Sequence, residues 1–244
     1  MVEYNSPRGP QLTDPKGFSL VEVIAAMAAG LVVVGAALQA LFYFQREFAR
    51  QHEWMVQQQD VRLGLELFEL ELRLASSKSL SVVLPDVVEF TANVSGLMTN
   101  TTGPIAAGQT TLTVEDGRGW PDNKPVSVCW NDQCEQFILA RAGQRNLLTL
   151  VQAVTRSIPS GALVMVMNRV RYYSRPDERG ILRWLRQIDG GASVIAGPIT
   201  QFTLRYQDAR GRPTMNPEVV HSVVVEIALP GRAAKETRQV SLRT

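Results

Sequence analysis

The stretch KGFSLVEV, residues 16–23, leads into a long apolar run. From Val23 to Phe44 there are 22 residues without a charge, and Gln39 is the only strongly polar side chain among them. At about 1.5 Å per residue, a helix of this length spans the roughly 30 Å hydrocarbon core of a bilayer. Buried helices of soluble proteins rarely stay apolar on every face over such a length. The run therefore predicts a membrane-resident helix.

The segment before this run differs from a secretory signal peptide. Residues 1–17 are polar and contain three prolines, whereas a signal peptide begins with a short basic region. The apolar run is longer than a signal core, and it leads into residues 45–47, Gln-Arg-Glu, without a small-residue cleavage site. Basic residues flank the run on both sides, so charge does not predict the orientation of the helix. We expect the helix to stay in the mature protein.

The junction resembles the type III signal sequence of type IV pilins and of the pseudopilins of type II secretion. The resemblance covers residues 15–45 and lies in the pattern G-F-x-L-x-E ahead of a long apolar helix. It implies that a prepilin peptidase cuts after Gly17 and that the new N-terminal residue, Phe18, is methylated. It also implies that Glu22 pairs with the N-terminal ammonium of a neighbouring subunit and sets the register of a filament. The mature chain would then comprise the 227 residues 18–244.

Physical arguments about two of these residues agree with the resemblance. A carboxylate near the start of a membrane helix is costly, which makes Glu22 a functional candidate. An acid in the first turns also gains from the helix dipole once Phe18 is the first residue. At Gly17 the peptidase must reach the backbone, and a side chain would obstruct it.

The helix is expected to continue beyond the apolar run. No proline occurs between Pro15 and Pro85, and residues 45–75 are rich in Leu, Glu, Arg and Gln. Two segments, 63–67 and 70–74, also fit the alternation of a strand, but their residue types favour a helix. Helical spacing relates five apolar residues, Val61, Leu65, Phe68, Leu72 and Ala75. We predict a helix over 18–75, with 18–44 in the membrane or filament core and 45–75 as an amphipathic continuation packed on a domain.

The remainder, residues 76–244, reads as one β-rich head, so the predicted fold class is α+β. Short β-type runs alternate with Gly, Pro, Asn and Asp, and about 170 residues are enough for a core. The expected strands are 81–90, 110–114, 126–130, 135–141, 147–153, 163–173, 181–187, 199–206, 219–229 and 237–242. Residues 93–108 show little pattern and are expected to form a loop.

The two cysteines, Cys129 and Cys134, flank the turn-like residues Asn131 and Asp132. A short loop places flanking residues opposite each other across a hairpin, and export supplies an oxidising compartment. A metal site would need two further ligands, and both histidines lie far away in the sequence. The sequence favours a disulfide.

An arginine-rich segment lies between residues 169 and 186. Its members are Arg169, Arg171, Arg175, Arg179, Arg183 and Arg186, against only Asp177 and Glu178. With aromatic residues nearby, this segment could contact DNA on a pilus used for uptake. The alternative is the solvated face of a β-hairpin, in which alternation places Arg169, Arg171 and Tyr173 on one side. The sequence favours the hairpin, and a nucleic-acid partner is not expected.

A second, weaker resemblance concerns the C-terminal half. Residues 170–173, 180–184 and 197–208 resemble parts of the C-terminal domains of PilW-type minor pilins and of the larger minor pseudopilin of type II secretion, the J component. The length of the head also favours a minor subunit, because a large head crowds a helical filament.

Enzyme motifs are missing from the sequence. It contains no G-x-S-x-G elbow, P-loop, H-E-x-x-H or dinucleotide fingerprint. Four scattered acids lack EF-hand spacing and are interpreted as turn residues: Asp116, Asp122, Asp132 and Asp208. The net charge of +2 also gives no general attraction to nucleic acid or anionic lipid. We expect a protein that is not an enzyme and that uses no cofactor and no metal.

These observations predict a minor type IV pilin that primes or takes part in pilus assembly. The expected partners are other pilins and minor pilins, the prepilin peptidase, the inner-membrane assembly platform and, before assembly, lipid of the cytoplasmic membrane. The head would lie in the periplasm and later on the cell surface. The first alternative is a minor pseudopilin of type II secretion. A further alternative is a signal-anchored envelope domain that never polymerises. It would not explain why Gly17, Phe18 and Glu22 occur at this spacing.

Overall fold

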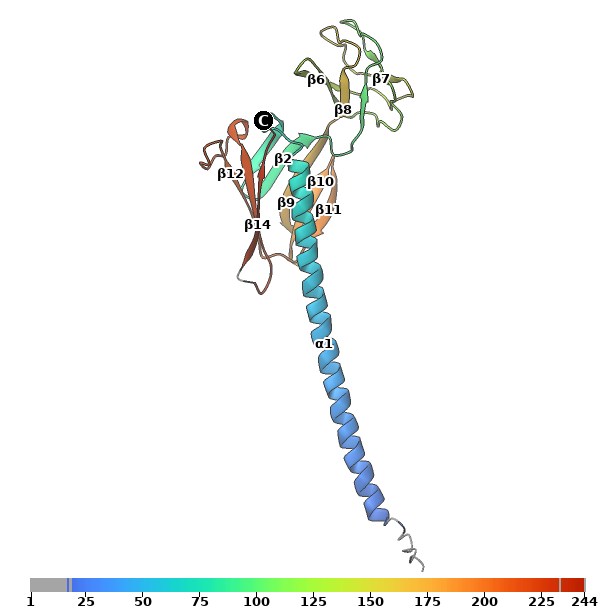
Figure 1. The fold of residues 1–244 in the computed structure, drawn as a ribbon, viewed down its shortest axis with the longest axis vertical. Coiled ribbons are helices and arrows are strands. Elements are labelled where there is room, and N and C mark those ends of the chain that lie inside the picture. The colour runs from blue at the N-terminus through green and yellow to red at the C-terminus, as the bar shows by residue number, and fades with distance from the viewer. Residues whose placement is uncertain (1–16, 18, 233, 244) are drawn as a thin grey trace, which may run out of the picture. The chain divides into compact units, whose positions relative to one another are not determined.

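The computed structural model describes residue 17, residues 19–232 and residues 234–243 (Figure 1). It divides into two compact units, Met1–Met55 and Val56–Thr244, and each is considered by itself. Most of the predicted leader and Phe18, the predicted methylation site, lie outside the described residues.

A single helix, α1 (Leu20–Leu72), confirms the expectation of one continuous helix. It begins two residues after the predicted start and ends three residues before the predicted end. In the first unit, every described residue from Ser19 to Arg46 is exposed, including the bulky apolar side chains. In the part of the chain that the structure describes, α1 is the one helix long and apolar enough to cross a membrane.

In the second unit, the end of α1 carries the buried stripe that the sequence predicted. The four helical members of that stripe are buried, as is the following alanine: Val61, Leu65, Phe68, Leu72 and Ala75. They belong to one hydrophobic cluster with the strands around them, which we call the first lobe of the head. The last part of the predicted continuation, from Val61 onward, therefore packs on the head, whereas residues 48–56 are exposed.

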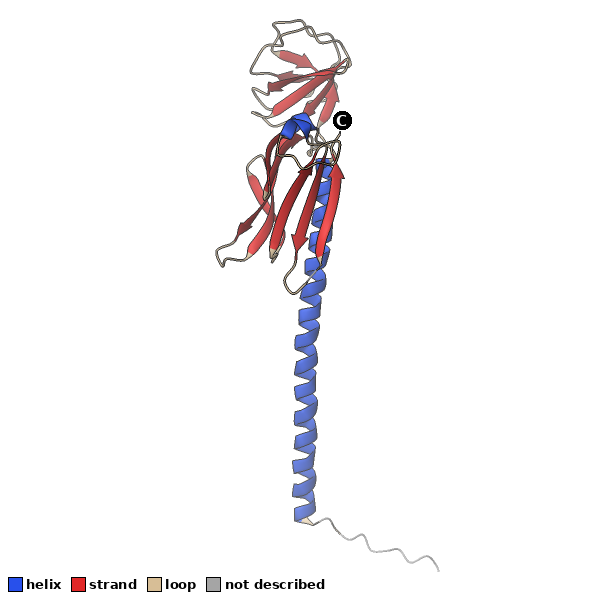
Figure 2. Cartoon of the chain, turned by 90° about the vertical axis from the view of Figure 1, so that its left-hand side faces the viewer, coloured by secondary structure: helices blue, strands red, loops and turns tan. Residues whose placement is uncertain are grey.

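Two antiparallel sheets complete the first lobe (Figure 2). The larger has the order β1-β2-β9-β10-β11 and the smaller the order β12-β13-β14. The strands of the larger sheet are β1 (Leu80–Leu84), β2 (Val87–Ala92), β9 (Asn168–Pro176), β10 (Leu182–Ile188) and β11 (Gly191–Ala196). Those of the smaller sheet are β12 (Gln201–Gln207), β13 (Ser222–Ala228) and β14 (Lys235–Ser241). Two short 3-10 helices, η1 (Ser77–Ser79) and η2 (Pro217–Val219), lie in the connections.

The segment between β2 and β9 forms a second lobe with its own hydrophobic core. β2 and β9 are direct neighbours in the larger sheet, with Ala92 opposite Asn168, so this segment is an insertion between two paired strands. Its sheets have the orders β3-β8-β5-β6 and β4-β7. The strands are β3 (Met98–Asn100), β4 (Thr111–Thr113), β5 (Pro125–Trp130), β6 (Gln133–Ile138), β7 (Leu147–Thr149) and β8 (Leu163–Val166). The fold class, a long N-terminal helix followed by a sheet-rich part, is α+β as predicted.

Several strand predictions were wrong in detail. The predicted strand 81–90 is a hairpin, because Pro85 and Asp86 form a turn between β1 and β2. The predicted strand 163–173 divides near Met167, where the chain passes from the sheet of the second lobe to that of the first. β3 lies within the predicted loop 93–108, and β11 was missed because its residues show no apolar–polar alternation.

Candidate functional site

The start of α1 is fixed by Ser19. Its side-chain oxygen accepts a hydrogen bond from the Val21 N–H at 3.2 Å, and its carbonyl accepts from the Glu22 N–H at 3.0 Å. Ser19 is therefore the N-cap, and Glu22 stands three residues later, at the spacing of a capping box. The side chain of Glu22 lies in the first helical turn, where the dipole favours an acid.

The surroundings of Glu22 are apolar and uncovered. It is exposed, as are Val21, Val23 and Met27 next to it on the helix. Gly17, on the N-terminal side, has no atom within 4 Å of the position that a Cβ would take. The predicted junction thus combines an accessible backbone with one carboxylate on an exposed apolar surface. Such a surface must be covered by lipid or by other helices.

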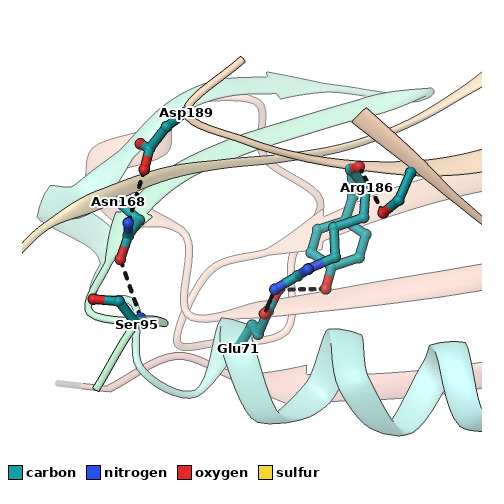
Figure 3. A network of polar contacts seen from close by, with 7 residues as sticks. Glu71, Ser95, Asn168, Arg186 and Asp189 are labelled. Atoms are coloured by element: carbon teal, nitrogen blue, oxygen red, sulfur yellow. Dashed lines mark hydrogen bonds and ion pairs between the residues drawn. The ribbon is translucent and has the colours of Figure 1, made fainter. Parts of the chain in front are cut away.

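A buried polar cluster, which the sequence analysis missed, joins α1 to the larger sheet (Figure 3). The Arg186 guanidinium on β10 donates to both carboxylate oxygens of Glu71, with Nε at 2.9 Å from Oε2. The Tyr172 hydroxyl on β9 donates to the same Oε2 at 2.5 Å. Glu71 is only 5% exposed, so its buried charge needs partners. The Arg186 guanidinium supplies the opposite charge, and the Tyr172 hydroxyl supplies a further hydrogen bond.

The cluster also changes the acid–base behaviour of its members. Burial, together with the neighbouring Glu71 carboxylate, raises the pKa of Tyr172 above its ordinary value, so the phenol stays protonated. The hydrogen bonds from Arg186 to Glu71 raise the pKa of the guanidinium further. Glu71 could have been suspected from the sequence, because it lies beside Phe68 and Leu72 on the predicted buried stripe.

Close packing accompanies this cluster. Gly64 faces the sheet, and a Cβ there would overlap Ile195 and approach the Trp184 ring to 2.6 Å. Trp184 is fully buried, and its ring centroid is 6.4 Å from that of Phe68. Only a residue without a side chain allows α1 to lie this near β10 and β11.

A second polar cluster connects the turn between β10 and β11 to the segments that enter and leave the inserted lobe, near Ser95 and Asn168 (Figure 3). Asp189, in the turn between β10 and β11, accepts from Asn168 Nδ2 at 2.8 Å and from Lys124 Nζ at 2.7 Å. Asn168 Oδ1 in turn accepts from the Ser95 N–H at 3.2 Å. Burial raises the pKa of Asp189, but the hydrogen bonds from Lys124, Asn168 and the Arg169 backbone outweigh it and lower the pKa below its ordinary value.

The six arginines do not form one surface. Arg186 points to the buried face of β10, as its pairing with Glu71 shows, so its inclusion in a nucleic-acid patch was wrong. The predicted hairpin is present as β9–β10, and its register places Arg175 opposite Arg183. The remaining members have different neighbours.

Two of these arginines are partly neutralised and one is stacked. Arg169 pairs with Glu89 at 3.5 Å, and Arg183 pairs with Asp177 at 3.1 Å. Arg171 lies 5.1 Å from the ring centroid of Tyr173. Arg175 and Arg179 are exposed and make no ion pair within the described residues. Among the described residues of the hairpin, Arg175 and Arg179 are the exposed arginines with neither an ion pair nor a stacking contact.

The disulfide prediction is confirmed. Cys129 on β5 and Cys134 on β6 are bonded and lie directly opposite each other, with their Cα atoms 4.1 Å apart. Asn131 and Asp132 form the turn between them, both with positive φ, which Asn and Asp tolerate better than most residues. The bond closes the hairpin at the edge of the inserted lobe.

The scattered acids are engaged in local turns. Asp116 pairs with Arg118 at 2.6 Å, and Asp208 pairs with Arg212 at 2.8 Å. Hydrogen bonds from the Arg118 side chain lower the pKa of Asp116 to about 2. Within the described ranges, no three His, Cys, Asp or Glu side chains gather as metal ligands would.

Comparison with known proteins agrees with the geometry of the junction. Neither the curated proteins nor the solved structures contain a match to this chain. Residues 14–38 match the family model of the prokaryotic N-terminal methylation motif. This range includes Gly17, Phe18 and Glu22 and the first part of α1. The motif and the apolar helix point to membrane anchoring, to processing by a prepilin peptidase and to pilus-type partners. The chain carries a prepilin signal of the type IV pilin kind.

Proposed function

We propose that this protein is a minor type IV pilin, a non-catalytic structural subunit. A prepilin peptidase cuts after Gly17 and methylates Phe18, and the head lies on the periplasmic side of the membrane. The subunit then joins other minor pilins and primes the assembly of a filament at its tip.

The observation that carries this proposal is the position of Glu22. It is the only charge between Gly17 and Phe44, it lies in the first turn of α1, and its apolar neighbours are exposed. In a bilayer or a filament core, a carboxylate is stable only with a cationic partner. The N-terminal ammonium created by cleavage at Gly17 is a cation of the right kind, and a neighbouring subunit supplies it.

The size of the head supports a minor role. It contains two separate hydrophobic cores, and the inserted lobe adds the segment between β2 and β9 to the first lobe. A subunit with so large a head is easier to accommodate at a tip than along a closely packed shaft.

Two substitutions test the proposal in cells that make the filament. Gly17→Trp is expected to leave an uncleaved precursor that is still in the membrane, because the side chain obstructs the peptidase. The matched control, Gly9→Trp, is expected to be cleaved. A Gly17→Trp protein that runs at the mature size on a gel contradicts cleavage at this site.

The role of Glu22 is tested separately. Glu22→Ala is expected to be cleaved normally but to enter sheared filaments poorly, since the register contact is lost. Gln39→Ala, the matched change at the other polar residue of the apolar run, is expected to be incorporated like the wild type. Equal incorporation of Glu22→Ala contradicts the pairing.

A minor pseudopilin of type II secretion shares the same signal and helix, and deletion phenotypes distinguish the two. Loss of pili with intact protein secretion agrees with the minor pilin. Loss of secretion with intact pili assigns the protein to the secretion system instead.

A further inference from the structure

The free edge of the larger sheet is formed by β11, and it lacks the features that usually protect an edge. Its sequence, GASVIA, contains no charge and no proline, and its first four residues are exposed. β11 pairs with β10 on one side only, and the described residues make no hydrogen bond to its other side. An exposed, uncharged edge strand is a ready template for another strand.

Three other sheet edges of the head carry charges or additional backbone hydrogen bonds. β14 carries Lys235, Glu236 and Arg238 along its length. At the end of β1, the Pro85 carbonyl accepts a hydrogen bond from the Leu204 N–H at 2.6 Å. At β3, the Asn100 carbonyl accepts from the Glu115 N–H at 3.0 Å. Within the described residues, β11 has neither a charged side chain nor a backbone hydrogen bond on its outer side.

The register of the β10–β11 hairpin identifies the open backbone groups. Ile188 and Gly191 are opposite each other across the two-residue turn formed by Asp189 and Gly190. In such a hairpin the flanking pair is hydrogen bonded, and the following pairs alternate. The N–H and C=O groups of Ala192 and Val194 therefore point away from β10, whereas those of Ser193 face it.

A cationic cavity adjoins this edge. An open cavity of about 490 Å³ is lined by Val194 of β11 and by charged residues of the β9–β10 hairpin: Arg175, Arg179 and Arg183, with Asp177 and Glu178. Val194 is 59% exposed, so the side of the cavity that β11 forms is open to solvent. A strand placed along β11 would carry every second side chain on this face of the sheet.

The charges of the cavity favour an acidic occupant. Asp177 is engaged within the cavity wall, because one carboxylate oxygen accepts from the backbone of Arg179 and Ile181 and the other from Arg183 Nε at 3.1 Å. Glu178 also lines the cavity, but it makes no ion pair with Arg175 or Arg179 among the described residues. The three arginines of the lining exceed its two acids by one charge. A carboxylate on an added strand would be attracted to the guanidinium groups of Arg175 and Arg179.

We propose that β11 is a docking edge that accepts an extended acidic segment of a partner subunit by β-strand addition. Backbone hydrogen bonds to Ala192 and Val194 supply the attachment, and a carboxylate toward Arg175 and Arg179 supplies the selectivity. A second copy of this chain fits less well, because its own β11 is uncharged and leaves the arginines uncompensated. The proposal concerns the head alone and does not depend on the processing of the N-terminus.

A pair of synthetic peptides tests the proposal on the full chain in detergent micelles. The probe is a labelled, capped peptide of alternating Val and Glu, and its match has Lys in place of Glu. We expect the acidic peptide to bind at least about tenfold more tightly than the basic one, and the difference to shrink as salt is raised above about 0.15 M. Equal affinities, or no binding of the acidic peptide up to about 1 mM, overturn the proposal.

Two variants separate the edge from the arginines. Ala192→Pro removes an N–H that points away from β10, so the hairpin should remain folded while peptide binding is lost. Ala192→Ser keeps the N–H and should bind like the wild type. Arg175→Glu combined with Arg179→Glu should reverse the preference between the peptides, whereas Arg210→Glu, in the exposed turn after β12, should not.

Amide hydrogen exchange distinguishes strand addition from simple anion binding. On binding, exchange should slow at Ala192 and Val194 and stay unchanged at Ser193, which already faces β10. Binding that leaves all three unchanged contradicts strand addition. A dimer of the full chain that Ala192→Pro abolishes would assign the edge to a second copy and overturn the acidic partner.

Discussion

The carboxylate of Glu71 and the guanidinium of Arg186 form a bidentate ion pair between α1 and β10, although the two residues are 115 positions apart in the sequence. Glu71 is 5% exposed, and the hydroxyl of Tyr172 supplies a third hydrogen bond. The C-terminal part of α1 is thereby attached to the larger sheet by a specific polar contact as well as by apolar packing.

Removing one partner of the pair should be strongly destabilising. Glu71→Ala leaves the Arg186 charge partly buried without compensation, which costs about 3–5 kcal/mol. Replacing both partners by apolar residues, Glu71→Leu with Arg186→Met, should recover most of that loss. Denaturant unfolding of the full chain in detergent measures both. Glu66→Ala, which breaks an exposed pair with Arg62, is the control and should cost about 0.5 kcal/mol or less.

A methyl group at Gly64 should destabilise the head even though alanine favours helices. The gain in helix propensity is about 1 kcal/mol, but overlap with Ile195 and Trp184 costs about 1–3 kcal/mol. The net effect is a loss of stability in thermal unfolding. Gly30→Ala, where nothing lies within 4 Å, is the control and should not lower the unfolding temperature of the head. A stabilised Gly64→Ala protein would contradict the close approach.

Loss of the disulfide should weaken the inserted lobe specifically. Cys129→Ser with Cys134→Ser removes a bond across a short hairpin, which contributes about 2 kcal/mol in the chain-entropy model. We expect proteolysis to become faster within residues 97–166, and the first lobe to keep its resistance. The cuts are mapped by mass spectrometry. Equal protection of the second lobe in wild type and variant would show that the bond adds nothing.

Acid should loosen the attachment of the inserted lobe through Asp189. Its pKa is below the ordinary value in the folded chain, so its stabilising effect is present at neutral pH and is lost as the pH falls below about 4. Asp189→Asn keeps a residue that tolerates positive φ and removes the charge. We expect it to cost on the order of 1 kcal/mol at pH 7 and to reduce the loss on acidification. An unchanged acid profile in Asp189→Asn would mean that other carboxylates dominate.

The sequence predicted those features that depend on local pattern. Three structures could be recognised from neighbouring residues alone. The uncharged run after Glu22 indicated the apolar helix, and the spacing from Val61 to Leu72 indicated its buried stripe. The two cysteines around an Asn-Asp turn indicated the disulfide. The arginine-rich hairpin was likewise apparent, because strand alternation is a local property.

Features that depend on distant residues could not be predicted in this way. Glu71 on an otherwise apolar stripe signals that a partner is needed, but nothing local identifies Arg186. The division of the head into two cores follows from the pairing of β2 with β9 across the insertion, and a single sequence carries no sign of that pairing. The role of Gly64 depends on the distant residue Trp184, whose ring lies beside it, and no local pattern indicates this contact.

We propose that this chain is a prepilin that is processed between Gly17 and Phe18. Mass spectrometry of the N-terminal peptide, taken from protein purified from cells with an active prepilin peptidase, tests it most directly. We expect a chain that begins at Phe18 and carries one methyl group on its amino nitrogen. A chain that still contains residues 1–17, or that begins after residue 44, would contradict it.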